Sequence, residues 1–278
     1  MYTTIIVIAL VCVLAGLLLA RSRRNKNRSS DLILVWSDEF DGAAESPPDA
    51  TKWTCEVGGG GFGNNELETY TSHPENVCHD GRGNLVITAR KETLAGPDGI
   101  KRDYTSARLN TLDKFDHKYG RVEGRIKVPA GKGMWPAFWM MGNDIAKIGW
   151  AGCGEIDLME VVEDASVNHG TVHGPGYSGA DGIGGAYKLP DGKKLSDDFH
   201  IYAIDWEPSA IHFSVDGNVY FSVRTADLKG KHWVYDHPFF ILLNVAVGGN
   251  WPGNPDDTTQ FPQMMLVDYV RAYKRANA

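Results

Sequence analysis

Beyond residue 30, short runs of alternating apolar and polar residues recur along the chain, and no sustained 3.6-residue periodicity accompanies them. In 121–128, small and apolar residues alternate with arginine, glutamate and lysine, which predicts a strand with one face in water. Another alternating run at 211–215 leads into Asp216-Gly217, a dipeptide typical of a two-residue hairpin turn, and then into 219–223. Further strands are predicted at 85–90, 105–110, 137–141, 155–161, 168–173, 199–206, 240–247 and 266–274.

About a dozen short strands separated by turn residues predict an all-β fold, a jelly-roll-like sandwich of two antiparallel sheets. The chain shows no internal repeat and no linker after Ser30, so residues 31–278 are interpreted as one domain. The length agrees with this interpretation, because all-β folds of more than about 200 residues commonly stay undivided.

The first 30 residues differ from the rest of the chain. Residues 2–20 are almost entirely apolar and, at about 1.5 Å per residue, would nearly span a hydrocarbon core of about 30 Å. Five basic residues follow between Arg21 and Arg28. Two interpretations stay open: a cleaved signal peptide, for which 13–15 resembles a cleavage site, and a retained membrane anchor. The basic flank conflicts with export, because the positive-inside rule would leave the domain in the cytoplasm.

The formal net charge of −7 combines two opposite contributions. Residues 1–30 carry five basic and no acidic side chains, so residues 31–278 hold 23 basic against 35 acidic residues, a net charge of −12. A nucleic-acid-binding domain needs a basic surface, and the composition therefore argues against a nucleic-acid partner. Four cysteines are too few for a disulfide scaffold, although Cys55 and Cys78 could pair in an oxidising compartment.

Three carboxylates lie within six residues in the segment 155–160, interleaved with large apolar side chains. In a regular strand Glu155 and Asp157 share one face, while Glu160 points to the other. A single-residue bulge at 158–159 would return Glu160 to the face of the other two acids and leave the apolar residues in the core. The sequence therefore predicts a bulged strand that lines a groove with three acids.

Grouping three negative charges raises the pKa of each carboxyl group. Glycosidases use such an arrangement, because one carboxyl must be ionised while another stays protonated as the general acid. A solvated acidic strand edge and a metal site are the alternatives. The tryptophans favour a carbohydrate cleft over both, because indole rings stack on sugars and their N–H groups donate to hydroxyls; they are Trp135, Trp139, Trp150, Trp206 and Trp251.

The segment Glu155-Ile156-Asp157-Leu158-Met159-Glu160 resembles the E-x-D-x-x-E signature of glycoside hydrolase family 16 in its β-bulge form. The resemblance extends over nearly the whole domain, from 36–41 to 267–273. Within the family the chain most resembles the laminarinase-like endo-β-1,3-glucanases, and the segments that carry this likeness are 63–67, 104–109, 135–141, 169–174 and 248–253. The resemblance implies a jelly-roll sandwich with a concave substrate cleft.

The resemblance also implies roles by position. Glu155 would be the nucleophile, Glu160 the general acid/base, and Asp157 the residue between them that tunes their protonation. Such enzymes retain anomeric configuration by double displacement, which requires two carboxyl groups about 5–5.5 Å apart. His173 resembles a histidine near the acid/base, and a purely structural strand histidine is the alternative. The remaining positions that resemble substrate-cleft residues are Asn65, Arg108, Trp135, Trp139, Trp150 and Trp251.

The family resemblance implies no cofactor for catalysis, but it raises the question of a structural calcium ion. Some members bind calcium on the convex side through two backbone carbonyls and one aspartate. The matching positions are Glu39, Gly83 and Asp268, a set of oxygen ligands that suits calcium. Without the resemblance, Asp268 would be interpreted as an ordinary strand-edge acid.

We therefore expect a retaining endo-β-glucanase that hydrolyses laminarin-like β-1,3-glucans, with mixed-linkage β-1,3-1,4-glucans as a further substrate. A non-catalytic β-glucan-binding protein on the same fold is the main alternative, and the presence of all three acids favours the enzyme. A third hypothesis is a family 16 hydrolase acting on agar, carrageenan or xyloglucan. A polymer substrate implies an exported protein, which would be extracellular, periplasmic or membrane-attached through residues 2–20, and we expect a monomer.

Overall fold

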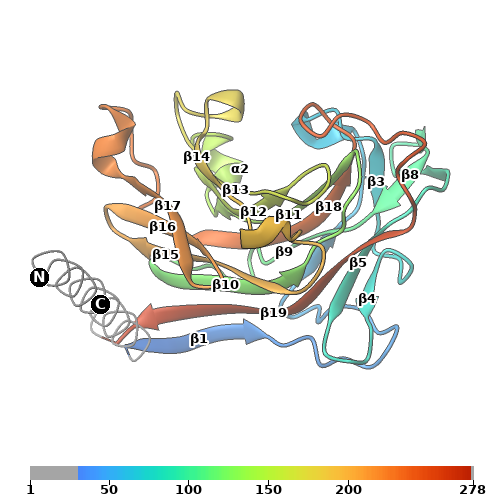
Figure 1. Cartoon of the computed structure of the whole chain (residues 1–278), viewed down its shortest axis with the longest axis horizontal. Coiled ribbons are helices and arrows are strands. Elements are labelled where there is room, and N and C mark those ends of the chain that lie inside the picture. The colour runs from blue at the N-terminus through green and yellow to red at the C-terminus, as the bar shows by residue number, and fades with distance from the viewer. Residues whose placement is uncertain (1–30, 277–278) are drawn as a thin grey trace, which may run out of the picture.

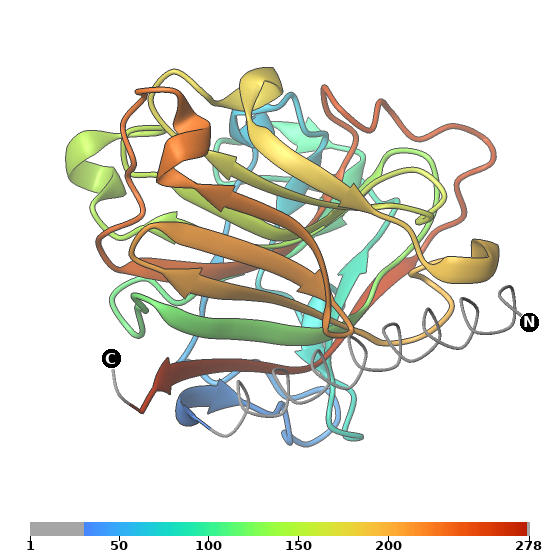
Figure 2. The ribbon, with the colours of Figure 1, turned by 60° about the vertical axis from the view of Figure 1, so that its left-hand side comes forward.

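The structure is a computed structural model that describes residues 31–276, and it is a sandwich of two large antiparallel sheets (Figures 1 and 2). The outer sheet has eight strands, in the order β17 (Asn218–Arg224), β16 (Ala210–Val215), β15 (His200–Glu207), β10 (Gly120–Lys127), β19 (Gln263–Arg275), β5 (Leu85–Ala89) and β4 (Val77–His79), with β1 (Leu32–Asp38) pairing with β19. The inner sheet has seven strands, in the order β14 (Ile183–Tyr187), β13 (Asn168–His173), β12 (Glu155–Val161), β11 (Met134–Gly142), β18 (Phe239–Val247), β9 (Arg108–Asn110) and β2 (Thr54–Glu56).

Smaller elements complete the described part of the chain. Two short ladders pair β3 (Glu68–Tyr70) with β8 (Tyr104–Ser106) in parallel, and β6 (Leu94–Ala95) with β7 (Lys101–Arg102). The helices are short: α2 (Ile145–Ile148) and 3-10 turns at Gly61–Gly63, Gly179–Asp181, Pro190–Gly192 and Thr225–Leu228. In Figure 1 the loops that carry α2 and the turns at Gly61–Gly63, Gly179–Asp181 and Thr225–Leu228 rise above the inner sheet, away from the outer sheet.

The predicted all-β sandwich is confirmed. Strands β12 and β13 have the predicted bounds, and the predicted hairpin turn joins β16 to β17 with positive φ at both Asp216 (49°) and Gly217 (76°), as the mirror-image hairpin turns require. The segment 105–110 is divided between β8 and β9, which belong to different sheets. The strands that the patterns did not predict either have only two or three residues, as β2 and β3 do, or lack alternation, as β1 and the glycine-rich β14 do.

The core lies between the two sheets. Val122 and Ile126 of β10 face Phe138 of β11 and Ile156 of β12, and all four side chains are fully buried. The sheets approach closely at Gly124, where a Cβ atom would lie 2.9 Å from the Phe138 ring. Each large apolar side chain buried here contributes about 1.5–3 kcal/mol to the free energy of unfolding, so this layer holds the inner sheet in place.

Two predictions concern the N-terminal segment and the cysteines. The predicted signal peptide or anchor, residues 1–30, lies outside the described residues. Between residues 31 and 276, every helix is too short or too polar to cross a membrane. Cys55, Cys78 and Cys153 are free thiols in the structure, so the pair that an oxidising compartment could join is not formed.

Candidate active site

A bulge in β12 places the three acids. On the β13 side, Asp157 pairs with Thr171 and Glu160 with His169, so β12 advances three residues where β13 advances two. The ladder between β12 and β11 shows the same shift, and Leu158 is the extra residue of β12. The predicted bulge is therefore confirmed, and the apolar residues Ile156, Leu158 and Met159 are buried in the core.

The three acids open into a cleft of about 1210 Å³ on the free face of the inner sheet. Its lining residues come from six adjacent strands, from β9 through β18, β11, β12 and β13 to β14, and from the loops around residues 63, 150, 180 and 250. The cleft therefore crosses the strands and offers a long floor, a shape that suits a polymer chain better than a small molecule.

Six of the seven predicted substrate-cleft residues line this cleft: Arg108, Trp135, Trp139, Trp150, His173 and Trp251. The seventh, Asn65, lies at the rim with an exposed side chain, and its Nδ2 donates to Oδ1 of Asn250, which does line the cleft (2.8 Å). Asn65 therefore supports a cleft residue from outside.

Several lining residues were not predicted, notably Asn64, Glu66, His169 and Asn244. Asn64 and Glu66 flank Asn65 in the segment that carried the family resemblance. Asn244 had a signal of its own, because it is the single polar residue in the apolar strand β18. A polar side chain in such a strand needs a hydrogen-bond partner when buried, and this requirement marks it for attention.

Indole groups hold two of the three acids. The Nε1–H of Trp150 donates to Oε2 of Glu155 (2.9 Å), and the Nε1–H of Trp135 donates to Oε1 of Glu160 (3.0 Å). Each carboxyl group is thereby fixed by a donor from a cleft-lining tryptophan. These bonds stabilise the ionised form of each acid without adding a positive charge.

His173 lies close to both Asp157 and Glu155. Its Nε2 lies 3.2 Å from Oδ2 of Asp157 and 3.7 Å from Oε1 of Glu155. A protonated imidazole here would offset part of the negative charge of both acids. The side chain is buried against Gly182, whose absent Cβ leaves room for the ring, because that atom would lie 2.5 Å from His173 Cε1.

Burial is the main influence on the protonation of the acids. It raises the pKa of Glu155 to about 8, and the negative charge of Asp157 adds to the increase. The positive charges of His173 and Arg108 and the Trp150 N–H act in the opposite direction. Glu155 is therefore a carboxyl group held between the two protonation states at neutral pH.

The pKa values of Glu160 and Asp157 are raised as well. Burial, followed by the negative charges of Asp157 and Glu155, raises the pKa of Glu160 well above its ordinary value. Burial alone raises the pKa of Asp157 in the same direction. The raised pKa of Glu160 suits a proton donor.

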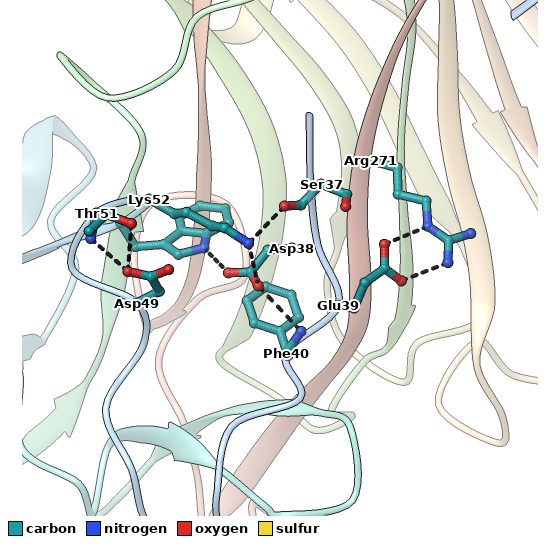
Figure 3. Close-up of polar contacts among 9 residues, drawn as sticks. Ser37, Asp38, Glu39, Phe40, Asp49, Thr51, Lys52 and Arg271 are labelled. Carbon is teal, nitrogen blue, oxygen red and sulfur yellow. Dashed lines mark hydrogen bonds and ion pairs between the residues drawn. The ribbon is translucent and has the colours of Figure 1, made fainter. Parts of the chain in front are cut away.

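The calcium prediction stays untested. The Asp268 carboxylate, the one charged ligand of the predicted calcium site, already accepts a hydrogen bond from Arg125 Nη1 (2.5 Å). The Glu39 carboxylate accepts from Nε and Nη2 of Arg271 at 2.9 and 2.6 Å (Figure 3). A cation at Asp268 would compete with the guanidinium group of Arg125 for that carboxylate.

Comparison with known proteins identifies the family of the chain. Residues 64–271 match the sequence profile of glycosyl hydrolases family 16. The chain belongs to this family. It is 41% identical over 276 residues to a β-glucanase of Rhodothermus marinus, an alignment that covers 95% of this chain and 93% of the relative.

Solved structures agree with the family assignment. The catalytic domain of a laminarinase (endo-1,3-β-glucanase) from Thermotoga petrophila is 50% identical with a TM-score of 0.83, covering 88% of this chain and 98% of that one. An endo-β-1,3-glucanase from Pyrococcus furiosus is 48% identical with a TM-score of 0.83, covering 88% and 95%. As in the rest of the family, the residues of this glycosyl hydrolase act without a cofactor.

The raised pKa values predict that this family 16 site lowers the stability of the fold as pH rises. An acid whose native pKa exceeds its unfolded value binds more protons in the native state, so the free energy of unfolding falls between the two pKa values. Asp157→Asn removes one such group and lowers the pKa of Glu155 and Glu160. We expect a higher midpoint of thermal unfolding, by about 5 °C near pH 8 and by less near pH 5.

Differential scanning calorimetry across that pH range measures this effect. Asp164→Asn is the control, because Asp164 is an exposed acid paired with Lys194, and we expect a change below about 1 °C. A midpoint for Asp157→Asn that falls, or that rises equally at both pH values, would contradict the electrostatic account of the cluster.

Proposed function

We propose that the protein is a retaining endo-β-1,3-glucanase that hydrolyses laminarin-like glucans, with Glu155 as nucleophile and Glu160 as general acid/base. The observation that carries the proposal is the bulge, since it directs Glu155 and Glu160 into one cleft and gives each its own indole donor. The named activities of the similar enzymes, β-glucanase and endo-1,3-β-glucanase, support the choice of substrate.

In the first step the ionised Glu155 carboxylate attacks the anomeric carbon of the sugar bound beside it. The bond from that carbon to the glycosidic oxygen breaks, and Glu160 donates its proton to the departing oxygen. The product is a glycosyl ester on Glu155, a free hydroxyl at the end of the released chain, and an ionised Glu160. The raised pKa of Glu160 suits this role, because the group enters the step with its proton.

In the second step Glu160 acts as a base. It removes a proton from a water molecule, whose oxygen attacks the anomeric carbon and displaces Glu155 as a carboxylate. The enzyme returns to its starting protonation state, and two inversions give net retention. Ester formation on Glu155 removes its negative charge and so lowers the pKa of Glu160, and the return of the Glu155 carboxylate raises the pKa of Glu160 again.

Asp157 and His173 tune these steps in the proposed mechanism. Asp157 raises the pKa of both glutamates, which keeps the proton on Glu160 before the first step. His173 opposes Asp157 at both glutamates. Asp157 and His173 thus shift the pKa values of the two glutamates in opposite directions.

Exposed aromatic rings supply surfaces for sugar units beyond the reacting bond. Trp251, 44% exposed, meets the ring of Trp135 edge-to-face at 5.5 Å and that of His169 at 5.0 Å. Trp150, 53% exposed, lies near His173 with ring centroids 6.1 Å apart. Each exposed indole can stack on a sugar ring, so the chain of the polymer is held on either side of the acids.

Glutamine at position 155 or 160 keeps the size of the side chain and removes the charge or the proton. We expect the hydrolysis of laminarin to fall about 10²–10⁴-fold or more in each variant, with a melting temperature no lower than that of the wild type. An activated aryl glycoside separates the roles, because its leaving group needs no proton. Glu160→Gln should still release the phenol in a burst from that substrate, whereas Glu155→Gln should not.

Glu163→Gln is the matched control, since Glu163 is an exposed glutamate three residues after Glu160. It should leave the rate unchanged. Turnover close to wild type in either Glu155→Gln or Glu160→Gln would overturn the assignment, and a folded wild type that binds laminarin without cleaving it would identify the β-glucan-binding alternative.

Product stereochemistry tests the double displacement directly. Proton NMR of the first products from laminarin should show the β-anomer before mutarotation, and an initial α-anomer would exclude a glycosyl ester on Glu155. Parallel digests of laminarin, lichenan and agarose distinguish β-1,3 from mixed-linkage and galactan cleavage. Endo action predicts that oligosaccharides of several sizes appear early, whereas release of one small product would indicate exo action.

The proposal extends to location, because a glucan polymer cannot cross a membrane. We propose that residues 1–30 direct export, and N-terminal sequencing of the protein from the producing cells tests this. A start near residue 16 indicates a cleaved signal peptide, whereas an intact N-terminus in the membrane fraction indicates an anchor. A full-length protein recovered from the cytoplasm would contradict export and agree with the basic flank at 21–28.

A further inference from the structure

A second group of polar side chains extends from the cleft lining into the protein interior, and the proposed reaction does not use it. The group consists of Glu66, Glu68, Tyr70 and Asn244, none of which is more than 8% exposed. Buried polar groups destabilise the fold unless they are hydrogen-bonded. The hydrogen bonds of this group connect it to the cleft.

Three hydrogen bonds form a chain that ends at a cleft tryptophan. The Nε1–H of Trp139 donates to Oδ1 of Asn244 (2.8 Å), and Asn244 Nδ2 donates to the Tyr70 hydroxyl oxygen (3.2 Å). The Tyr70 hydroxyl in turn donates to Oε2 of Glu66 (3.0 Å). An indole N–H can only donate and a carboxylate can only accept, so the two ends fix the direction of every bond between them.

The other oxygen of Glu66 holds a second part of the cleft. Its Oε1 accepts from Nδ2 of Asn64 at 3.3 Å. Asn64, Trp139 and Asn244 all line the cleft, and the Trp139 ring lies 4.8 Å below the guanidinium carbon of Arg108. The Glu66 carboxylate therefore orients three side chains in the part of the cleft that β11, β18 and β9 form.

Glu68 is the second acid of this buried group. Glu68 Oε2 accepts from the backbone N–H of Val247 (2.7 Å), while its buried Oε1 has no partner as an acceptor. Burial, followed by the negative charge of Glu66, raises the pKa of Glu68 well above its ordinary value. The raised pKa favours a proton on Glu68, which would let the unpaired oxygen donate.

We propose that Glu66 is a positioning residue for glucan binding, because its carboxylate fixes Trp139 and Asn244 through Tyr70 and holds Asn64 directly. This inference rests on the proposed function, which assigns the cleft to a glucan chain. The bound sugar would meet an indole and two amide groups that are already oriented. Less conformational freedom is then lost on binding, and the expected benefit lies in substrate affinity more than in the rate of bond cleavage.

A matched pair of substitutions two residues apart tests the inference. In Glu66→Gln the NH2 group of the new amide must point toward either the Tyr70 hydroxyl or the Asn64 amide. Two hydrogen-bond donors then face each other, and one of the two hydrogen bonds is lost. In Glu68→Gln the side chain keeps an acceptor for Val247 and a donor toward Glu66. Tyr70→Phe breaks the chain at its centre without changing either acid.

We expect Glu66→Gln and Tyr70→Phe to raise KM for laminarin about three- to tenfold while kcat changes less than about twofold. Glu68→Gln should leave both constants within about twofold of wild type. Thr111→Val is a stability control. Its buried hydroxyl donates to Phe115 O and accepts from Ile241 N and does not line the cleft, so its loss should lower the melting temperature without changing KM.

Calorimetric binding of a β-1,3-linked oligosaccharide to each variant, combined with Glu155→Gln so that the ligand is not cleaved, gives a second measurement that is independent of turnover. Weaker binding by Glu66→Gln and Tyr70→Phe, with binding by Glu68→Gln maintained, supports the inference. Unchanged KM and affinity in Glu66→Gln, or an equal loss in Glu68→Gln, would show that the buried group is only structural. A wild type that neither binds nor cleaves β-1,3-glucan would instead overturn the proposed function itself.

Discussion

The extra residue in β12 is the constraint on which the cleft depends. A regular strand alternates its side chains, so it cannot present Glu155, Asp157 and Glu160 on one face. The bulge at Leu158 changes the alternation once, and two adjacent apolar residues, Leu158 and Met159, then enter the core together. Their burial against the outer sheet holds the bulge in place, so packing of the sandwich and placement of the acids are one structural feature.

Placing three acids together destabilises their ionised forms, and neutral hydrogen-bond donors in the site reduce this effect. Three buried carboxyl groups cannot all ionise, which is why the pKa of each is raised. Trp150 and Trp135 each give one N–H to an acid and keep part of the ring in the cleft. The same side chains therefore stabilise the acids and offer surfaces to the sugar. Glu68 follows a similar principle, because burial raises the pKa of its carboxyl group.

Much of this site was predictable from local sequence. The spacing of Glu155, Asp157 and Glu160 required a bulge if all three acids were to act together, and the structure contains it. The hairpin at Asp216-Gly217 was predictable because both positions need positive φ. By contrast, β2 and β3 have three residues each and no periodicity to detect. Such strands form because their neighbours in the fold supply hydrogen-bond partners.

The sequence by itself determined the all-β class, the bulged acidic strand and the family, because these depend on side-chain periodicity and on motifs within short segments. Only the tertiary structure decided which side chains meet. It brought Trp150 to Glu155 and Trp135 to Glu160, left Asn65 at the rim, and joined Glu66 to Asn244 across 178 positions of sequence through Tyr70. Hydrogen-bond direction and burial arise from contacts between strands distant in the chain, and no local pattern records them.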